Sequence, residues 1–253
     1  MPLRVGFDLD GTVADMYSAL HAEAVKLFGE EVLRKAAYAS KTPPQVVSAE
    51  AVGGDAEAAA ADKSVRPEDD STTNLAMQEL HLSGRQQAQL WDHIKNVENF
   101  WTTLPALEPG IISRIARTAA QRRWEVIFLT TRPSTVGDLV QLQSQQWLDA
   151  HGFRYPSVYV VQRSRGKIAE ALGLDAFVDD RPENCLDIAV ESKAKVILVW
   201  HGNVKDVPPG AKRFGVQPVQ TISEAVALLE RLDDVRSQPS IMRSIKRAFG
   251  AAD

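Results

Sequence analysis

Five short apolar runs rich in β-branched residues alternate with segments that have the features of helices. The runs cover residues 3–7, 124–129, 158–161, 176–178 and 196–200. Such alternation is typical of parallel sheets, because two parallel neighbouring strands need a crossover connection, usually a helix. It is regular from residue 108 to residue 233. The sequence therefore predicts an α/β fold, a doubly wound, Rossmann-like parallel sheet.

Residues that mark helix ends support this alternation. Proline is favoured in the first turn of a helix, serine at the N-cap, and glycine just beyond the last turn. The sequence places Pro109 and Pro182 at first turns, Ser134 and Ser164 at N-caps, and Gly152 and Gly173 beyond C-terminal ends.

More than a hundred residues separate the first two strands, far more than a connection inside an α/β unit needs. Periodic segments at 19–28 and 84–97 predict helices, so residues 14–103 are expected to form an inserted helical cap. Residues 1–13 and 104–235 would form the core. The Ala-, Gly- and acid-rich segment 48–71 is expected to be mobile, and 236–253 to be a tail with a short amphipathic helix.

Composition excludes several classes of protein. The chain has 253 residues, 44% of them hydrophobic, as in soluble globular proteins. Its net charge of -4 disfavours nucleic-acid binding. The single cysteine, Cys185, excludes an internal disulfide, and the N-terminus has neither a signal-peptide pattern nor a membrane span. We therefore expect a soluble, cytoplasmic protein.

The first strand ends in two carboxylates, Asp8 and Asp10, followed by Gly11. Strand side chains alternate between faces, so both carboxylates should project to the same side. Like charges this close repel each other, and the cost is tolerated where a cation or a reaction uses both. For an isolated pair, a strand-end turn is an equally good interpretation.

Polar residues also follow later strands. Thr130, Thr131 and Arg132 follow the second strand, and Asp179 and Asp180 the fourth. In doubly wound folds, ligands bind beyond the carboxyl ends of the strands. Four carboxylates there would suit Mg²⁺. Thr130 and the nearby Lys167 would supply the hydroxyl and ammonium groups that a phosphoryl group needs.

These motifs resemble those of the haloacid dehalogenase-like hydrolase superfamily. The matching motifs are Asp8-Leu9-Asp10-Gly11-Thr12, Phe128-Leu129-Thr130, Lys167 and Asp179-Asp180. Within the superfamily, the chain is most similar to the 5'(3')-deoxyribonucleotidase-like phosphatases with a helical cap. The similar stretches are Phe100-Trp101, 107–110, 128–133 and 162–167.

The resemblance implies a role for each motif. Asp8 would be the nucleophile that forms an aspartyl-phosphate, and Asp10 the general acid and base. Mg²⁺ would bind Asp8, the Asp10 carbonyl, Asp179 and, directly or through water, Asp180. Thr130 would bind the phosphoryl group, and Lys167 would neutralise its charge and orient Asp8. Dehalogenases and phosphonatases lack an aspartate at the position of Asp10, so a phosphatase is favoured.

Other residues could bind the rest of the substrate, a small-molecule phosphate ester. Thr131 is a candidate for substrate binding. Arg132, Arg163 and Arg165 could hold a phosphate or a substrate tail, although surface exposure is the default for arginine. Phe100 and Trp101 could stack on a nucleobase, with packing as the alternative. The histidines show no metal-ligand spacing.

Three functions remain open. The first is a Mg²⁺-dependent phosphomonoester hydrolase with 5'-nucleotidase activity. The second is a phosphatase of the same superfamily that acts on a sugar phosphate or another small phosphoester. The third is a phosphate-ligand-binding or regulatory protein with weak turnover.

Overall fold

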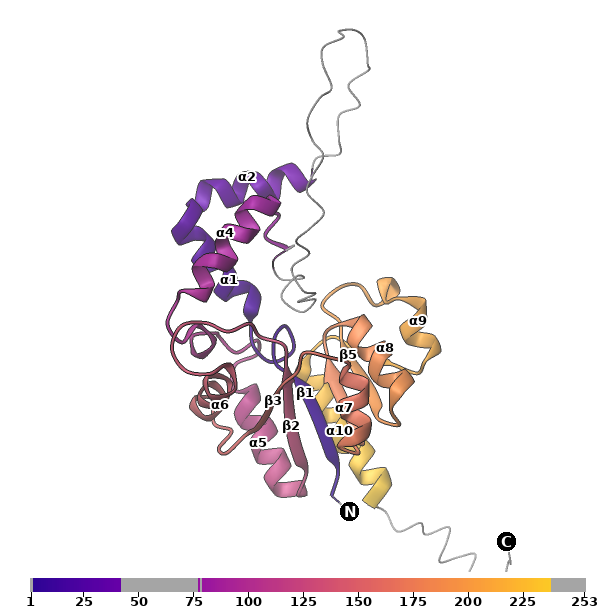
Figure 1. Ribbon diagram of the computed structural model, residues 1–253. Helices are drawn as coiled ribbons and strands as arrows, with labels where there is room; N and C mark the ends of the chain where they lie inside the picture. Colours follow the sequence, from indigo (N-terminus) through magenta and orange to yellow (C-terminus); the bar gives the residue numbers. More distant parts are fainter. Residues whose placement is uncertain (1, 42–76, 78, 238–253) are drawn as a thin grey trace, which may run out of the picture.

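The computed structural model describes residues 2–41, 77 and 79–237, and a six-stranded parallel sheet lies at its centre (Figure 1). The strand order is β3-β2-β1-β4-β5-β6. The predicted doubly wound α/β fold is confirmed. β6, a three-residue edge strand that contains Pro218, is not among the strands that the apolar runs predict. The strands are β1 (Arg4–Asp8), β2 (Glu125–Thr130), β3 (Ser157–Val160), β4 (Ala176–Asp179), β5 (Lys195–Val199) and β6 (Gln217–Val219).

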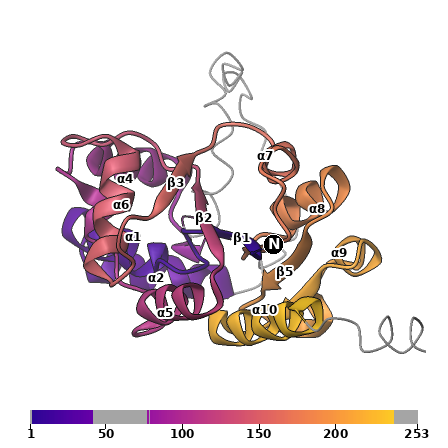
Figure 2. The ribbon, with the colours of Figure 1, turned by 90° about the horizontal axis from the view of Figure 1, so that it is seen from below.

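Helices cover both faces of the sheet, as the view along the strands shows (Figure 2). Successive strand residues point to opposite faces, so Phe128 belongs to one apolar cluster and Leu129 to the other. One face packs against α5 (Ile111–Arg122), α6 (Val140–Ala150) and α10 (Ile222–Ser237). The other packs against α7 (Arg165–Ala171), α8 (Pro182–Glu191) and α9 (Pro209–Arg213), with the turn η2 (Val204–Asp206) before α9.

The register of the sheet brings the strand ends together. β1 pairs with β2 on one side, with Asp8 opposite Leu129, and with β4 on the other, with Phe7 opposite Val178. Thr130 follows Leu129 in β2, and Asp179 follows Val178 in β4. The side chains predicted to form the site therefore lie at one edge of the sheet.

Most of the predicted helix ends are confirmed. Two predictions are wrong: α5 begins at Ile111 after Gly110, two residues past Pro109, and α6 begins at Val140, six residues past Ser134. Residues 131–139 instead run as an irregular loop, which no local cap signal predicts. The confirmed ends are Pro182 at the start of α8, Ser164 at the N-cap of α7, and Gly152 and Gly173 at positive φ beyond α6 and α7.

The insertion after β1 is helical where the structure describes it. It contains α1 (Met16–Phe28), α2 (Glu30–Lys41), α4 (Gly84–Lys95) and the short turn η1 (Phe100–Thr102), so the helices expected at 19–28 and 84–97 are confirmed. The outgoing and returning segments lie side by side. The Asp15 N–H donates to the Pro105 carbonyl at 2.9 Å, and the Leu107 N–H donates to the Val13 carbonyl at 2.9 Å. The three helices lie beyond the carboxyl ends of the strands (Figure 1).

Two predicted segments lie outside the described residues. They are 48–71 and the tail from 238 onward, whereas residues 236 and 237 continue α10. Within the described ranges, no helix has the length and apolar character needed to cross a membrane.

Candidate active site

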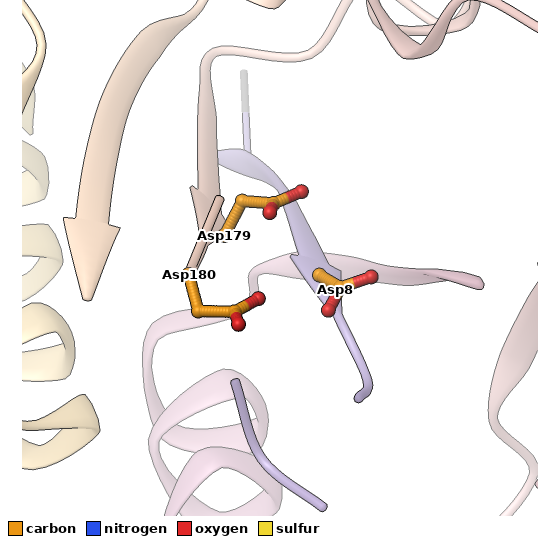
Figure 3. A group of neighbouring side chains, drawn as sticks. All are labelled: Asp8, Asp179 and Asp180. Atoms are coloured by element: carbon orange, nitrogen blue, oxygen red, sulfur yellow. The ribbon is translucent and has the colours of Figure 1, made fainter. Parts of the chain in front are cut away.

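Three carboxylates converge where β1 and β4 end (Figure 3). Asp8 ends β1, Asp179 ends β4, and Asp180 follows it; one oxygen from each lies within 4.8 Å of the others. Thr12 links two of them, because its hydroxyl lies 3.2 Å from Asp8 Oδ2 and 3.1 Å from Asp180 Oδ1. Asp179 is held from α8, since its carboxylate accepts from the Arg181 N–H at 2.9 Å and from Asn184 Nδ2 at 3.1 Å. We refer to Asp8, Asp179 and Asp180 as the acidic cluster.

The cation beside the acidic cluster is Arg165, not Lys167. Arg165 Nη1 lies 2.6 Å from Asp8 Oδ1 and 2.6 Å from Asp179 Oδ2, and the side chain is buried. Lys167 is exposed and lines a cavity of about 440 Å³ with Arg163 and Ile168, away from the carboxylates. The expectation that Arg165 lies on the surface is therefore wrong in this structure. Arg165 makes the contact with Asp8 that was expected of Lys167, and the catalytic role of Lys167 stays a prediction.

Helix geometry explains why Arg165, and not Lys167, lies beside the acidic cluster. Ser164 caps α7, so Arg165 is its first residue. Residues four apart share a helix face, which places Arg165 above the buried Ala169. Lys167 is two positions on and points to the opposite side. The predicted N-cap and the small residues Gly166 and Ala169 were signals that could have identified the buried face.

When all three carboxylates are ionised, the acidic cluster carries more negative charge than Arg165 neutralises. Burial, with added repulsion from Asp179 and Asp10, raises the pKa of Asp8 from 3.8 to about 7 against the opposing effect of Arg165. Burial also raises the pKa of Asp180 well above its usual value, with added repulsion from Asp8 and Asp179. Three oxygen donors with surplus charge could hold a hard divalent cation, which would relieve this repulsion.

Gly11 permits the close approach of the β1 loop to Asp180. Its φ is +83°, and a Cβ atom there would lie 2.3 Å from Asp180 Oδ2. We predict that Gly11→Ala lowers the free energy of unfolding by on the order of 1–3 kcal/mol and, by displacing Asp180, weakens the affinity of the acidic cluster for a divalent cation. Denaturant unfolding and calorimetric Mg²⁺ titration measure the two effects.

Gly110 offers a matched control for this substitution. It also has a positive φ, +73°, but the nearest atom to a new Cβ would be Ser113 Oγ at 3.9 Å. Gly110→Ala should therefore show backbone strain alone and keep Mg²⁺ affinity. Equal loss of Mg²⁺ binding in both variants would contradict the role of Gly11.

Asp10 lies in a second buried network, separate from the acidic cluster. Thr130 Oγ1 lies 3.1 Å from Asp10 Oδ2, and the Arg132 guanidinium binds both carboxylate oxygens. Arg132 is only 4% exposed, so the default of a surface position is wrong in this structure, and its role in substrate binding stays a prediction. Thr130 is fully buried on Asp10, and its phosphoryl-binding role stays a prediction. The metal-binding role of the Asp10 carbonyl also stays a prediction.

The two aromatic residues expected to contact a nucleobase are part of the core. Phe100 and Trp101 are 1% and 0% exposed, and their rings meet edge to face with centroids 5.0 Å apart. The Trp101 indole N–H donates to the Pro133 carbonyl at 2.9 Å. Neither ring has a free face, so their expected stacking on a substrate is wrong here and the packing alternative holds.

Thr131, a predicted substrate-binding residue, borders an open cavity. It lines a cavity of about 490 Å³ with Leu139, Tyr159 and Val160, and its hydroxyl lies 3.4 Å from Arg165 Nη2. His201, which follows β5, also lies near the site, with Nε2 3.0 Å from the Gly11 carbonyl oxygen. The sequence has no spacing signal for His201.

No protein-family model matches the chain, and no curated protein matches it. Similar solved structures include a haloacid dehalogenase-like family hydrolase from Xanthomonas campestris, at 14% identity over 92% of this chain and 96% of that chain (TM-score 0.46). A haloacid dehalogenase-like hydrolase from Streptococcus pneumoniae is 13% identical over 90% and 98% (TM-score 0.49). A HAD family hydrolase from Deinococcus radiodurans, with bound phosphate and sodium, is 15% identical over 91% and 96% (TM-score 0.48).

Proposed function

We propose that this protein is a Mg²⁺-dependent phosphomonoester hydrolase that acts through an aspartyl-phosphate intermediate. The observation that carries the proposal is the acidic cluster, which places a potential nucleophile among oxygen donors for a cation. Asp10, two residues after Asp8, adds a second carboxylate that could transfer protons.

The chain's own residues divide the chemistry between them. A carboxylate oxygen of Asp8 attacks phosphorus, the P–O bond to the leaving group breaks, and Asp10 gives that oxygen a proton. Asp10 then takes a proton from water, which attacks the phosphoryl group and releases phosphate and free Asp8. Arg165 holds Asp8 in place and takes the charge-neutralising role that the resemblance implies for Lys167. Mg²⁺ held by Asp8, Asp179 and Asp180 would stabilise negative charge on the phosphoryl oxygens.

The choice of substrate is a finer part of the proposal. Similarity of short stretches to the deoxyribonucleotidase-like group supports a nucleoside 5'-monophosphate. Because Phe100 and Trp101 are buried, other residues would have to contact the base. A sugar phosphate or another small phosphoester is the alternative, with the same chemistry at phosphorus.

A second candidate function is phosphate-ligand binding with little turnover. One observation favours it: arginine side chains engage both carboxylates that would react, Arg165 on Asp8 and Arg132 on Asp10. Ion pairing lowers the reactivity of a carboxylate unless substrate or cation binding rearranges it.

A panel of phosphate esters tests these functions. Deoxyribonucleotides, ribonucleotides and sugar phosphates are incubated with the purified protein, with Mg²⁺ or with EDTA, and released phosphate is measured. We expect Mg²⁺-dependent hydrolysis of at least one physiological ester. Preference for sugar phosphates would reject the nucleotidase assignment, and tight binding without release across the panel would favour the second candidate.

The raised pKa of Asp8 predicts how Mg²⁺ binding depends on pH. A carboxyl group whose pKa is higher in the folded state than in the unfolded state stabilises the folded protein when it is protonated. For Asp8 in the metal-free protein, this contribution is fully present below pH 3.8, the pKa of the unfolded state, and is lost as the pH rises through about 7. Mg²⁺ must displace that proton, so its affinity should fall by roughly tenfold or more between pH 8 and pH 5.5. Thermal unfolding with and without Mg²⁺ at both pH values measures this. An equal gain in Tm at the two pH values would contradict it.

A further inference from the structure

The Asp10 carboxylate is held on both oxygens by one buried side chain. Arg132 Nε lies 3.0 Å from Oδ1 and 2.9 Å from Oδ2, and Nη2 lies 2.7 Å from Oδ1. Thr130 adds a contact to Oδ2. A guanidinium that bonds both oxygens fixes the plane of the carboxylate as well as its distance, which a lysine ammonium cannot do.

The guanidinium is itself fixed on its other sides. Arg132 Nη1 donates to Ser144 Oγ at 2.9 Å, and the Ser144 hydroxyl donates to the Val140 carbonyl of α6 at 2.8 Å. The Trp101 ring lies 5.0 Å from the guanidinium carbon. Each nitrogen of the Arg132 guanidinium is thus directed to Asp10 or to Ser144, so these contacts hold the guanidinium beside the Asp10 carboxylate.

Trp101 connects this network to the segment that returns from the helical insertion. It belongs to η1, and its backbone N–H donates to Gln143 Oε1 of α6 at 3.0 Å. Gln143 in turn donates to the Asp138 carbonyl at 2.6 Å. One continuous set of buried contacts thus runs from η1 through α6 and Arg132 to Asp10.

We propose that Arg132 is a positioning residue that sets the place and orientation of the Asp10 carboxylate for proton transfer to the leaving group, with Ser144 and Trp101 holding its guanidinium. The proposal rests on the hydrolase function proposed above and goes beyond it. Proton transfer to a leaving oxygen requires a carboxylate within hydrogen-bond reach, so a small displacement of Asp10 slows that step without weakening substrate binding.

The test compares two aryl esters that differ in their need for a proton. The p-nitrophenolate anion leaves readily without one, whereas phenolate leaves slowly unless it is protonated. For Arg132→Gln we expect the single-turnover rate of Asp8 phosphorylation to fall about 100-fold with phenyl phosphate and less than 10-fold with p-nitrophenyl phosphate, with KM within about threefold. Arg132→Lys and Ser144→Ala should show the same selectivity with smaller losses, and they keep the test valid if Arg132→Gln fails to fold.

Arg122→Gln is the matched control, because Arg122 pairs with Asp233 and Asp234 at the contact of α5 with α10, away from the site. It should leave the ratio of the two rates unchanged. An equal loss of rate on both esters in the Arg132 variants would overturn the proposal. A rise in KM alone would also overturn it and would indicate that Arg132 binds substrate.

A measurement without turnover separates this proposal from the proposed function. Asp10→Asn, Arg132→Gln and the double variant are compared by their Tm values. Coupled residues predict that the double variant loses less Tm than the sum of the single losses. Additive losses of Tm would overturn the positioning role of Arg132. Absence of hydrolysis of both esters by the wild-type protein would instead count only against the proposed hydrolase function.

Discussion

Asp8→Asn is expected to lower phosphate release by at least about three orders of magnitude, because a carboxamide cannot form the acyl-phosphate bond. The substitution changes almost no volume and removes one negative charge from the acidic cluster. Steady-state hydrolysis of the best ester from the panel, at saturating Mg²⁺, measures the loss. Acid quenching should trap a phosphorylated protein for the wild type and none for the variant.

Loss of folding would not explain this result. Burial already raises the pKa of Asp8 to about 7, so a neutral residue relieves a cost that the metal-free protein bears at alkaline pH. We therefore expect the Tm of metal-free Asp8→Asn at pH 8 to stay within a few degrees of the wild type. Asp149→Asn, an exposed change on α6, is the control for both measurements. Turnover that survives in Asp8→Asn would refute the covalent mechanism.

The central part of the fold could be predicted because its physical signal is strong. Parallel strands covered on both faces are apolar along most of their length, and the four inner strands, β2, β1, β4 and β5, show this pattern. The edge strand β6 covers only Gln217–Val219 and is partly exposed, so its residues need not be apolar and leave no apolar run in the sequence. The start of α6 was misplaced because tertiary hydrogen bonds, such as Asp138 N–H to Asn99 Oδ1 at 2.8 Å, stabilise the preceding loop.

The acidic cluster could be predicted for a related reason. In a parallel sheet, residues at strand ends meet at one edge whatever the details of the helices, so Asp8 and Asp179 come together from topology alone. The partners of these carboxylates depend instead on side-chain direction. Arg165 turns inward through the phase of α7, and Arg132 binds Asp10 through a loop whose path no local pattern determines. The burial of Phe100 and Trp101 could not be predicted from local sequence either, because it depends on the packing of α6.

Arg165→Gln is expected to lower turnover by about 100-fold or more, whereas Lys167→Gln should stay within about threefold of the wild type. Arg165 Nη1 contacts Asp8 and Asp179 at 2.6 Å each, so its loss removes the group that orients the nucleophile and would neutralise the phosphoryl oxygens. Lys167 lies on the exposed face of the same helix, two residues away. Each variant thus removes one positive charge from α7, and the two differ in whether that charge lies on the buried or the exposed face of the helix.

Thermal unfolding distinguishes loss of catalysis from loss of structure in this pair. Without Arg165, the buried carboxylates lose their counter-charge, so the metal-free variant should melt at a lower temperature than the wild type. Mg²⁺ would replace that charge, so it should raise the Tm of Arg165→Gln more than that of the wild type or of Lys167→Gln. Turnover that is lost in Lys167→Gln and kept in Arg165→Gln would instead restore the role implied by the sequence motif. That outcome would mean that α7 turns Lys167, rather than Arg165, toward Asp8 during the reaction.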